Sequence, residues 1–381
     1  MRRFLTVSVV LVGAALLLCS VGMPRAVADT GSSEARIGRL QALLDRLVRE
    51  SDIPGAQLVI TESGHDIRIS SGVGDLATGA PFPPTAQVRI ASVTKSFVAA
   101  TVLRLAADND VELDAPVERY LPGVVHGPGG DGNLITVRNL LQHTSGIPDY
   151  LDKLDISTEA ALRNPRPAAE LIRLGLDQAS HFTPGTEYGY SNTNYLLAGK
   201  LIEQVTGRSL REVVTDRVIA PLGLADTYWP DFPHEQVIRG PHPHGYAILE
   251  GELVDLDDFD PSWGLADGGM VAAPADLNRY FMSLLAGRVL PPAQLADMQR
   301  TFPSSDPAQP DRAGLGLFRL ENSCGLDTWG HDGAFPGYGV VSMATKDLAV
   351  TLTLNQLPEK LVTEGDTPLV SVLTDTAICG Q

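Results

Sequence analysis

Apolar positions follow a helical period near the start of the chain and a strand-like pattern just after it. Between residues 35 and 51 they recur every three or four positions, which predicts a helix that buries Ile37, Leu40, Leu43, Leu44, Leu47 and Val48. The stretches 56–63 (AQLVITES) and 67–75 (IRISSGVGD) predict two strands joined at Gly64 as a hairpin. The run 97–109 (FVAATVLRLAADN) is apolar nearly all round, which is typical of a buried central helix.

From about residue 109 the pattern changes to short helical segments between Pro- and Gly-marked turns, at 136–143, 167–177, 194–207 and 209–223. Two more helices are predicted at 275–287 and 292–302, followed by strands at 337–347 and 348–356 and a last helix at 368–379. Strands at both ends of a helical middle predict an α/β domain, 29–108 with 262–381, whose antiparallel sheet is flanked by helices. A mostly helical domain, 109–261, is inserted into it.

The first 28 residues have the pattern of a secretory signal. Arg2 and Arg3 precede an apolar run of 19 residues, and residues 26–28 (AVA) form a small-residue cleavage site. A retained membrane anchor is the alternative, because such a run is just long enough to span a bilayer. The leucines before Cys19 disfavour a lipoprotein. We expect a secreted protein, cleaved before Asp29 and without a stable membrane anchor, and leave the Sec or Tat route open.

The net charge narrows the classes of partner, and the cysteine content suggests a disulfide. Without Arg2, Arg3 and Arg25 the 29 basic residues fall to 26 against 46 acidic ones, a formal net charge of −20. Such an acidic protein is not expected to bind nucleic acid or anionic membranes. Cys324 and Cys379 remain after signal removal, and an even pair in an oxidising compartment suggests a disulfide. Two buried free thiols are the alternative.

The tetrad Ser92-Val93-Thr94-Lys95 places a hydroxyl and an amine three residues apart, on one face of the predicted helix. A serine hydroxyl becomes a good nucleophile only when a neighbouring base removes its proton. Lysine can be that base if burial favours its neutral form, and the apolar run after Phe97 provides such burial. Alone, the tetrad is a weak motif, since it also suits the start of any buried helix.

Two further stretches carry polar groups suited to the same chemistry. In 188–195 (YGYSNTNY), Tyr190 can relay a proton and Asn192 can hold a substrate carbonyl, although a polar loop before a helix is the simpler interpretation. In 329–339 (WGHDGAFPGYG), Gly333 permits close backbone approach. A backbone N–H just beyond it, with that of Ser92, would form an oxyanion hole. His331 by itself would be only a polar surface residue.

Taken in order, Ser92-Val93-Thr94-Lys95, Tyr190-Ser191-Asn192 and His331-Asp332-Gly333 resemble the three motifs of the penicillin-recognising serine hydrolases. The chain looks most like the class C β-lactamases and the secreted D-alanyl-D-alanine carboxypeptidases, over essentially all of its length after residue 28. The stretches 140–150 (LLQHTSGIPDY) and 314–317 (GLGL) and the cysteine seven residues before His331 belong to the resemblance. It implies an α/β fold of the β-lactamase/transpeptidase type, with the active site in the cleft between the two domains.

The resemblance also implies roles for the motif residues. Ser92 would form the acyl-enzyme with Lys95 as base, Tyr190 would protonate the leaving group and help activate the deacylating water, and Asn192 would bind the acyl side. His331 would be catalytic, in a position where many relatives carry lysine.

Other implied features concern binding and stability. The N–H groups of Ser92 and Ala334 would form the oxyanion hole, Trp263 would line the cleft, and Cys324 would be bonded to Cys379. No metal or cofactor is implied, and His242 and His244 are predicted to lie in a turn rather than in a metal site.

The sequence departs from the carboxypeptidase pattern where those enzymes grip the free carboxylate of the substrate with an arginine and two hydroxyls. The arginine position is Phe318, and the hydroxyl positions on either side of Gly333 are Asp332 and Ala334. Each lost charge-assisted bond costs roughly 1.5–3 kcal/mol, and a nearby like charge costs more. Arg319 should point to the opposite face of its strand. Either the enzyme does not favour substrates with a free carboxylate, or another arginine or a shifted loop binds that carboxylate.

The leading expectation is therefore a secreted, monomeric D-alanyl-D-alanine carboxypeptidase-like hydrolase acting on peptides such as the peptidoglycan stem, with β-lactams as acylating inhibitors. The alternatives are an esterase, amidase or D-aminopeptidase with a neutral or cationic leaving side, or a class C-like β-lactamase. The β-lactamase is less favoured because His331 replaces lysine. A non-catalytic binding protein is disfavoured by the complete set of Ser92, Lys95, Tyr190 and Asn192.

Overall fold

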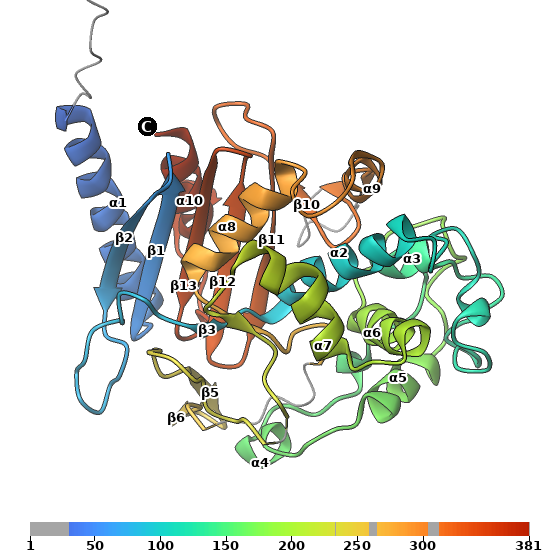
Figure 1. The fold of residues 1–381 in the computed structure, drawn as a ribbon. Helices are drawn as coiled ribbons and strands as arrows, with labels where there is room; N and C mark the ends of the chain where they lie inside the picture. Colours follow the sequence, from blue (N-terminus) through green and yellow to red (C-terminus); the bar gives the residue numbers. More distant parts are fainter. Residues whose placement is uncertain (1–29, 233, 259–264, 304–311, 381) are drawn as a thin grey trace, which may run out of the picture.

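An eight-stranded antiparallel sheet organises one half of the molecule (Figure 1). The computed structural model describes residues 30–232, 234–258, 265–303 and 312–380. The strands, in the order β2-β1-β13-β12-β11-β10-β9-β8, are β1 (Gly55–Glu62), β2 (His65–Gly72), β8 (Phe302–Pro303), β9 (Arg312–Ala313), β10 (Phe318–Leu320), β11 (Thr328–Phe335), β12 (Tyr338–Ala344) and β13 (Leu348–Leu354). The hairpin β1–β2 pairs with β13, so both ends of the chain form one sheet, as predicted.

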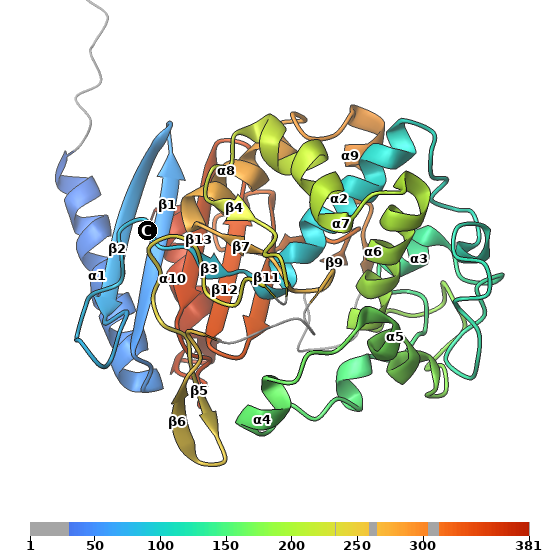
Figure 2. The ribbon, with the colours of Figure 1, turned by 60° about the horizontal axis from the view of Figure 1, so that its bottom comes forward.

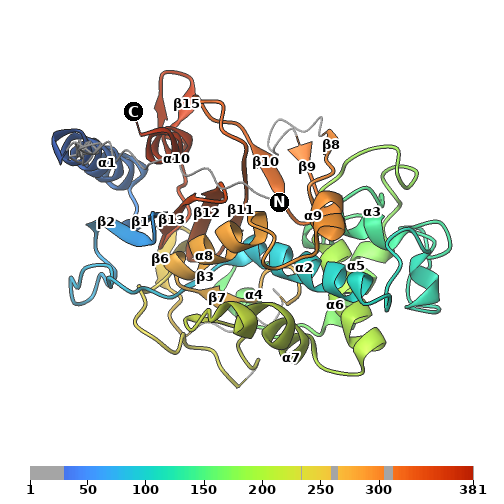
Figure 3. The same cartoon turned by 45° about the horizontal axis from the view of Figure 1, so that its top comes forward.

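Helices cover both faces of this sheet. On one face, α1 (Thr30–Ser51) and α10 (Leu369–Cys379) lie together (Figure 3) and bury Leu58 of β1 and Leu352 of β13. On the other face, Asn278 of α8 (Pro274–Leu285) donates hydrogen bonds to the Val59 carbonyl (3.0 Å) and the Thr61 hydroxyl (2.9 Å). The period of two along β1 therefore separates an apolar face from a hydrogen-bonded one.

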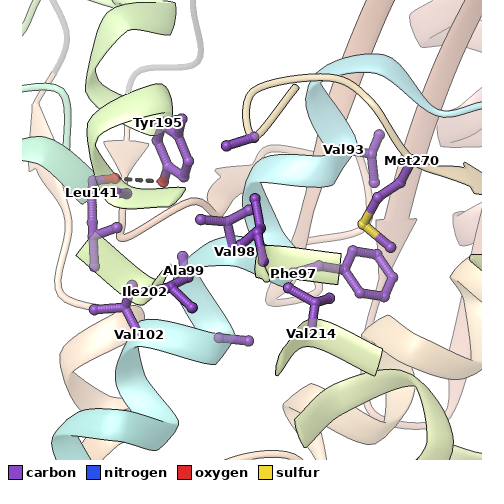
Figure 4. Close-up of a cluster of buried hydrophobic side chains, with 14 of the residues drawn as sticks. Val93, Phe97, Val98, Ala99, Val102, Leu141, Tyr195, Ile202, Val214 and Met270 are labelled. Atoms are coloured by element: carbon purple, nitrogen blue, oxygen red, sulfur yellow. Dashed lines mark hydrogen bonds between the residues drawn. The ribbon is translucent and has the colours of Figure 1, made fainter. Parts of the chain in front are cut away.

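Helix α2 (Thr94–Ala107) connects the sheet to the helical half, and residues 94–103 are all buried. Figure 4 shows its side chains among residues of several other helices. The Tyr195 hydroxyl of α6 (Asn192–Thr206) donates to the Leu141 carbonyl of α3 (Val137–Leu141), 2.8 Å away, beside Ala99. A helix packed on every side cannot shift easily, so the residues at its start are fixed relative to both halves.

The helical half also contains α4 (Glu159–Leu162), α5 (Ala168–Leu176) and α7 (Leu210–Val214), and α9 (Pro292–Met298) packs against α2. The predicted helix 209–223 is α7 followed by a π turn and a 3₁₀ turn. The predicted helix 292–302 ends at Met298 because the chain then enters β8. The other predicted helices are present with small shifts of their ends.

Several short strand pairs have no counterpart in the sequence prediction. They are the sheet of β3 (Val88–Arg89), β7 (Val271–Ala272) and β4 (Thr227–Tyr228), the hairpin β5 (Tyr246–Leu249) with β6 (Glu252–Asp255) seen in Figure 2, and β14 (Thr363–Glu364) with β15 (Thr367–Pro368). Since β4 pairs with β7, and Tyr246 N–H donates to the Asn355 carbonyl just beyond β13 (2.8 Å), the chain rejoins the α/β half by Thr227. That is well before the predicted boundary at residue 261.

A disulfide joins Cys324, between β10 and β11, to Cys379 at the end of α10, with the two Cα atoms 5.7 Å apart. This is the disulfide that the resemblance implied. The predicted signal segment, residues 1–28, lies outside the described residues. Within the described part of the chain, no helix combines the length and apolar character that a membrane span requires.

Candidate active site

The nucleophile candidate, Ser92, lies in the 3₁₀ turn Ala91–Val93 that leads directly into α2. Ala91 has φ +48°, a left-handed conformation that costs a residue with a Cβ about 1–2 kcal/mol. Ala91 is only 1% exposed, so packing around it holds the strained turn in place. The turn therefore places Ser92 directly before α2, whose residues 94–103 are all buried.

Lys95 is fully buried and makes three hydrogen bonds through Nζ. Its partners are Ser92 Oγ (2.9 Å), Asn192 Oδ1 (2.7 Å) and the Asp267 carbonyl oxygen (2.7 Å). A neutral amine has two N–H donors and one lone pair. Because the amide and carbonyl oxygens can only accept, they take both donors, and the lone pair is left for the Ser92 hydroxyl proton.

The electrostatic surroundings of Lys95 suit this role. Burial lowers the pKa of Lys95 to about 8, while the nearby carboxylates of Asp267, Asp149 and Asp332 act in the opposite direction. Roughly one-tenth of the amine is therefore neutral at pH 7. The side chain is a usable base near neutrality, as the apolar sequence after it predicted.

Asn192 and Tyr190 approach from the start of α6. Asp149 accepts hydrogen bonds from the Asn192 backbone N–H (3.2 Å) and from Nδ2 (2.7 Å), which directs the amide oxygen of Asn192 toward Lys95. Burial raises the pKa of the Tyr190 phenol well above its usual range, and a side-chain hydrogen bond with Ser92 opposes that rise. Tyr190 is thus a protonated phenol beside the nucleophile and can act as a proton donor.

His143 supports Tyr190 from behind. The two rings stack with centroids 4.3 Å apart, and His143 Nδ1 accepts the Ser191 backbone N–H at 3.1 Å. Burial lowers the pKa of His143 well below its ordinary value, so the imidazole is neutral. The residue has φ +57°, which again indicates a backbone held by its packing. His143 lies in the 140–150 stretch that belongs to the resemblance, but no role for it was predicted from the sequence.

The third motif is a regular strand, β11, whose residues alternate in exposure. His331, Gly333 and Phe335 are buried, and Asp332 and Ala334 are exposed. A Cβ at position 333 would lie 2.6 Å from the Ile90 carbonyl oxygen and 2.9 Å from the Ser92 nitrogen. Glycine therefore lets β11 lie directly against the nucleophile turn.

A cavity of about 50 Å³ lies at this junction. It is lined by residues from five separate parts of the chain: Ala91, Ser92, Leu151, Asn192, Asp267, Gly268, Ala334 and Phe335. Ser92 and Ala334, whose N–H groups are the predicted oxyanion donors, thus share one cavity with Asn192. Trp263, the aromatic residue predicted to line the cleft, lies outside the described residues.

Two predicted site residues are in the interior instead of the cleft. His331 is 1% exposed, its Nδ1–H donates to the Asp332 carbonyl (2.5 Å), and burial lowers its pKa, so it is neutral at pH 7. Its ring packs on Phe318 (4.6 Å), which is 2% exposed and contacts Tyr188. The alternation of β11 explains the burial of His331, because position 331 falls on the inward face together with Gly333. Neither side chain presents surface to a substrate.

Arg319 points away from Phe318, as expected, and the two histidines contact carboxylates. Arg319 Nε donates to Asp327 Oδ1 (2.8 Å), on the opposite side of β10 from Phe318. His242 and His244 lie in the irregular segment before β5 and contact Asp257 and Asp255, each at 2.8 Å. No group of three metal-binding side chains with suitable geometry is present among the described residues.

Sequence reasoning missed a buried acidic network behind Lys95. The Tyr150 hydroxyl donates to Asp267 Oδ2 at 2.9 Å. Burial raises the pKa of Asp267 to about 6, opposed by the charge of Lys95, and burial also raises the pKa of Asp149. Asp149 and Tyr150 are the last residues of the 140–150 stretch, so that motif could have indicated their place in the site. For Asp267 the sequence offered no indication beyond the neighbouring glycines.

Comparison with known proteins places this geometry in a family. The Beta-lactamase family model matches residues 40–373. The curated protein Esterase EstB from Burkholderia gladioli is 32% identical over 305 residues, which cover 73% of this chain and 75% of the esterase.

Solved structures agree over a larger share of the chain. A D-stereospecific amidohydrolase from Streptomyces sp. superposes with a TM-score of 0.80 at 30% identity, covering 90% of this chain and 99% of the other. The D-amino acid amidase from Ochrobactrum anthropi SV3, in complex with L-phenylalanine amide, gives 0.77 at 26% identity, covering 91% and 98%. With a family model that spans most of the sequence and a serine-lysine-tyrosine arrangement assembled in one site, the chain belongs to the Beta-lactamase family of serine hydrolases.

Proposed function

We propose that this hydrolase cleaves amides and esters of D-amino acids through an acyl-enzyme at Ser92, and that it is not a carboxypeptidase of free D-Ala-D-Ala termini. The names of the similar proteins, an esterase, a D-stereospecific amidohydrolase and a D-amino acid amidase, support this substrate class. The predicted signal segment supports a further proposal, that the enzyme acts outside the cell.

In the proposed first half-reaction, Ser92 Oγ attacks the substrate carbonyl carbon while its proton passes to Lys95 Nζ, 2.9 Å away. The negative charge that develops on the carbonyl oxygen is stabilised by the N–H groups of Ser92 and Ala334. The bond to the leaving nitrogen or oxygen then breaks as Tyr190 donates its proton, which Lys95 replaces. In the second half-reaction, the oxygen of a water molecule attacks the acyl carbon while its proton passes to the same groups, and the bond to Ser92 Oγ breaks as Oγ takes that proton back and the acid is released.

The observation that carries the choice of substrate is the leaving side of the site. Phe318 is a buried apolar residue, Asp332 is an acid and Ala334 has no hydroxyl. A substrate that ends in a free carboxylate would meet a like charge and none of the three side chains expected to bind it. Removing that carboxylate, as an amide or ester, removes this penalty.

The test compares kcat/KM for D- and L-phenylalanine amide, and for a diacylated L-Lys-D-Ala-D-Ala peptide and its C-terminal amide. The Ser92→Ala protein serves as the blank. We expect the D-amide to exceed the L-amide, and the amidated peptide to exceed the free acid by at least tenfold, the loss of one such bond. Faster cleavage of the free acid would make the protein a carboxypeptidase. Rapid turnover of benzylpenicillin would favour the β-lactamase alternative.

A further inference from the structure

An unpaired carboxylate stands beside the catalytic cavity. The side chain of Asp332 is 64% exposed and projects from the same face of β11 as Ala334. Residues two apart on a strand are about 7 Å apart. Because Ala334 lines the cavity with Ser92, the Asp332 carboxylate lies at the mouth of the site.

The contacts around Ser92 show which end of a substrate Asp332 would meet. The cavity beside Ser92 is lined by Asn192, to which the resemblance assigns the acyl side of the substrate, and by Phe335 at the far end of β11. Asp332 lies in the opposite direction along β11, and its charge acts on Tyr190, the proposed proton donor to the leaving group. A group that leaves toward Tyr190 therefore leaves toward Asp332.

The described part of the chain offers Asp332 no direct ion-pair partner, since the hydrogen bonds of Lys95, the nearest catalytic cation, go to Ser92, Asn192 and Asp267. Among the described residues, its one basic neighbour within 4.0 Å is His331, with Nδ1 at 3.8 Å, and that imidazole is neutral and already hydrogen-bonded to a carbonyl. The internal stretches outside the description, 233, 259–264 and 304–311, contain no lysine, arginine or histidine. The carboxylate is therefore free to interact with a charged ligand.

We propose that Asp332 is a specificity residue that favours substrates whose leaving group carries an ammonium or quaternary ammonium ion. This inference rests on the proposed function and names the leaving side of the same substrates. An exposed ion pair contributes modestly, and we expect roughly a fivefold effect on kcat/KM at low ionic strength. The effect should decrease as salt screens the charge.

Three esters of D-phenylalanine test the proposal, with leaving alcohols that differ chiefly in charge. They are choline, its neutral isostere 3,3-dimethylbutanol, and glycolic acid, which carries a carboxylate. The quantity is the ratio of kcat/KM for each charged ester to that for the neutral ester, measured within one enzyme. Because the ratio is taken within each variant, a change in the basicity of Lys95 that the substitution causes for all three esters alike cancels.

The variants are Asp332→Asn and a matched control, Asp327→Asn. Both remove one negative charge from an exposed side chain, and Asp327 is 62% exposed and paired with Arg319. The control lies five residues before Asp332, and its charge, unlike that of Asp332, does not act on Lys95. The control therefore reports the effect of net charge alone.

We expect the unchanged protein and Asp327→Asn to prefer the choline ester about fivefold and to disfavour the glycolate ester, and Asp332→Asn to bring both ratios close to one. If the choline preference is absent, or survives in Asp332→Asn, the inference is overturned. The proposed function still stands in that case, provided that the neutral ester is cleaved in a Ser92-dependent way. Preference for the glycolate ester would reveal a carboxylate grip and overturn the inference. If none of the three esters is cleaved by Ser92, the proposed function fails and the inference fails with it.

Discussion

Replacing Gly333 with alanine tests the central feature of the site, the contact between β11 and the nucleophile turn. The added Cβ would lie 2.6 Å from the Ile90 carbonyl oxygen, 2.9 Å from the Ala91 Cβ and 2.9 Å from the Ser92 nitrogen. Ordinary contacts of a Cβ are about 3.4–4 Å. The strand and the turn must therefore separate by roughly 0.5–1 Å, and all three obstructing groups belong to backbone or to a short, fixed side chain.

This displacement would act on catalysis more than on folding. The Ser92 N–H is one of the two proposed oxyanion donors, and loss of one such donor costs about 2.7–4 kcal/mol, or 10²–10³ in kcat. Overpacking of a buried site costs about 1–3 kcal/mol of stability, which a folded domain of this size can tolerate. We therefore expect Gly333→Ala to fold, to unfold at a lower temperature, and to lose at least 10² in kcat.

The assay measures kcat for a D-phenylalanine ester and the thermal unfolding midpoint of the same preparation. Gly38→Ala, on α1, is the control, because no group outside its own helix turn lies within 4 Å of the added Cβ. It should keep kcat within about threefold, since it moves no oxyanion donor. A folded Gly333→Ala protein with kcat within threefold of the unchanged enzyme would refute the reasoning.

Two further perturbations test the network behind Ser92 and the disulfide. The rise of kcat/KM with pH should be centred near the Lys95 pKa of about 8, because the neutral amine is the base. In Asp267→Asn the midpoint should move to lower pH, because a carboxylate that holds the proton on Lys95 is removed. The control Asp276→Asn, which changes a buried acid on α8, should leave the midpoint in place. An unmoved midpoint in Asp267→Asn would exclude this coupling. Replacing Cys324 and Cys379 with serine should lower the free energy of unfolding by about 4 kcal/mol for a 55-residue separation, measured by denaturant titration. The midpoint of the pH profile should stay unchanged in that variant, and an unfolding curve equal to that of the intact protein would show that the bond contributes no stability.

The sequence predicted the long, periodic elements well because their patterns are local. The amphipathic period of α1, the apolar run of α2 and the alternation of β1 and β13 each reflect the face that is buried, and all four elements are present. Two-residue strands such as β4 and β7 have no period to detect, and their pairing depends on residues 43 and 45 positions apart. The early return of the chain to the α/β half was missed for that reason.

The site residues were likewise predictable only where they lie in a short local motif. Ser92, Lys95, Tyr190 and Asn192 were identified because each lies in a short motif, and the structure brings all four together. Asp267 lies 172 residues from Lys95 and acts through its backbone carbonyl and a buried carboxylate, neither of which a residue pattern reveals. The burial of His331 was not predicted, because its side chain was considered by itself, as a surface residue, and the alternation of its strand was not applied.

The basicity of Lys95 connects the buried network to the proposed choice of substrate. Burial lowers its pKa and three carboxylates act to raise it, and of these only Asp332 is exposed at the mouth of the site. A cationic leaving group placed against Asp332 would offset that charge, lower the pKa of Lys95 and increase its neutral fraction at pH 7. A neutral isostere would not. The preference for a cationic leaving group should therefore appear in kcat as well as in KM below pH 8, and its kcat component should fade above that pH, where Lys95 is already neutral.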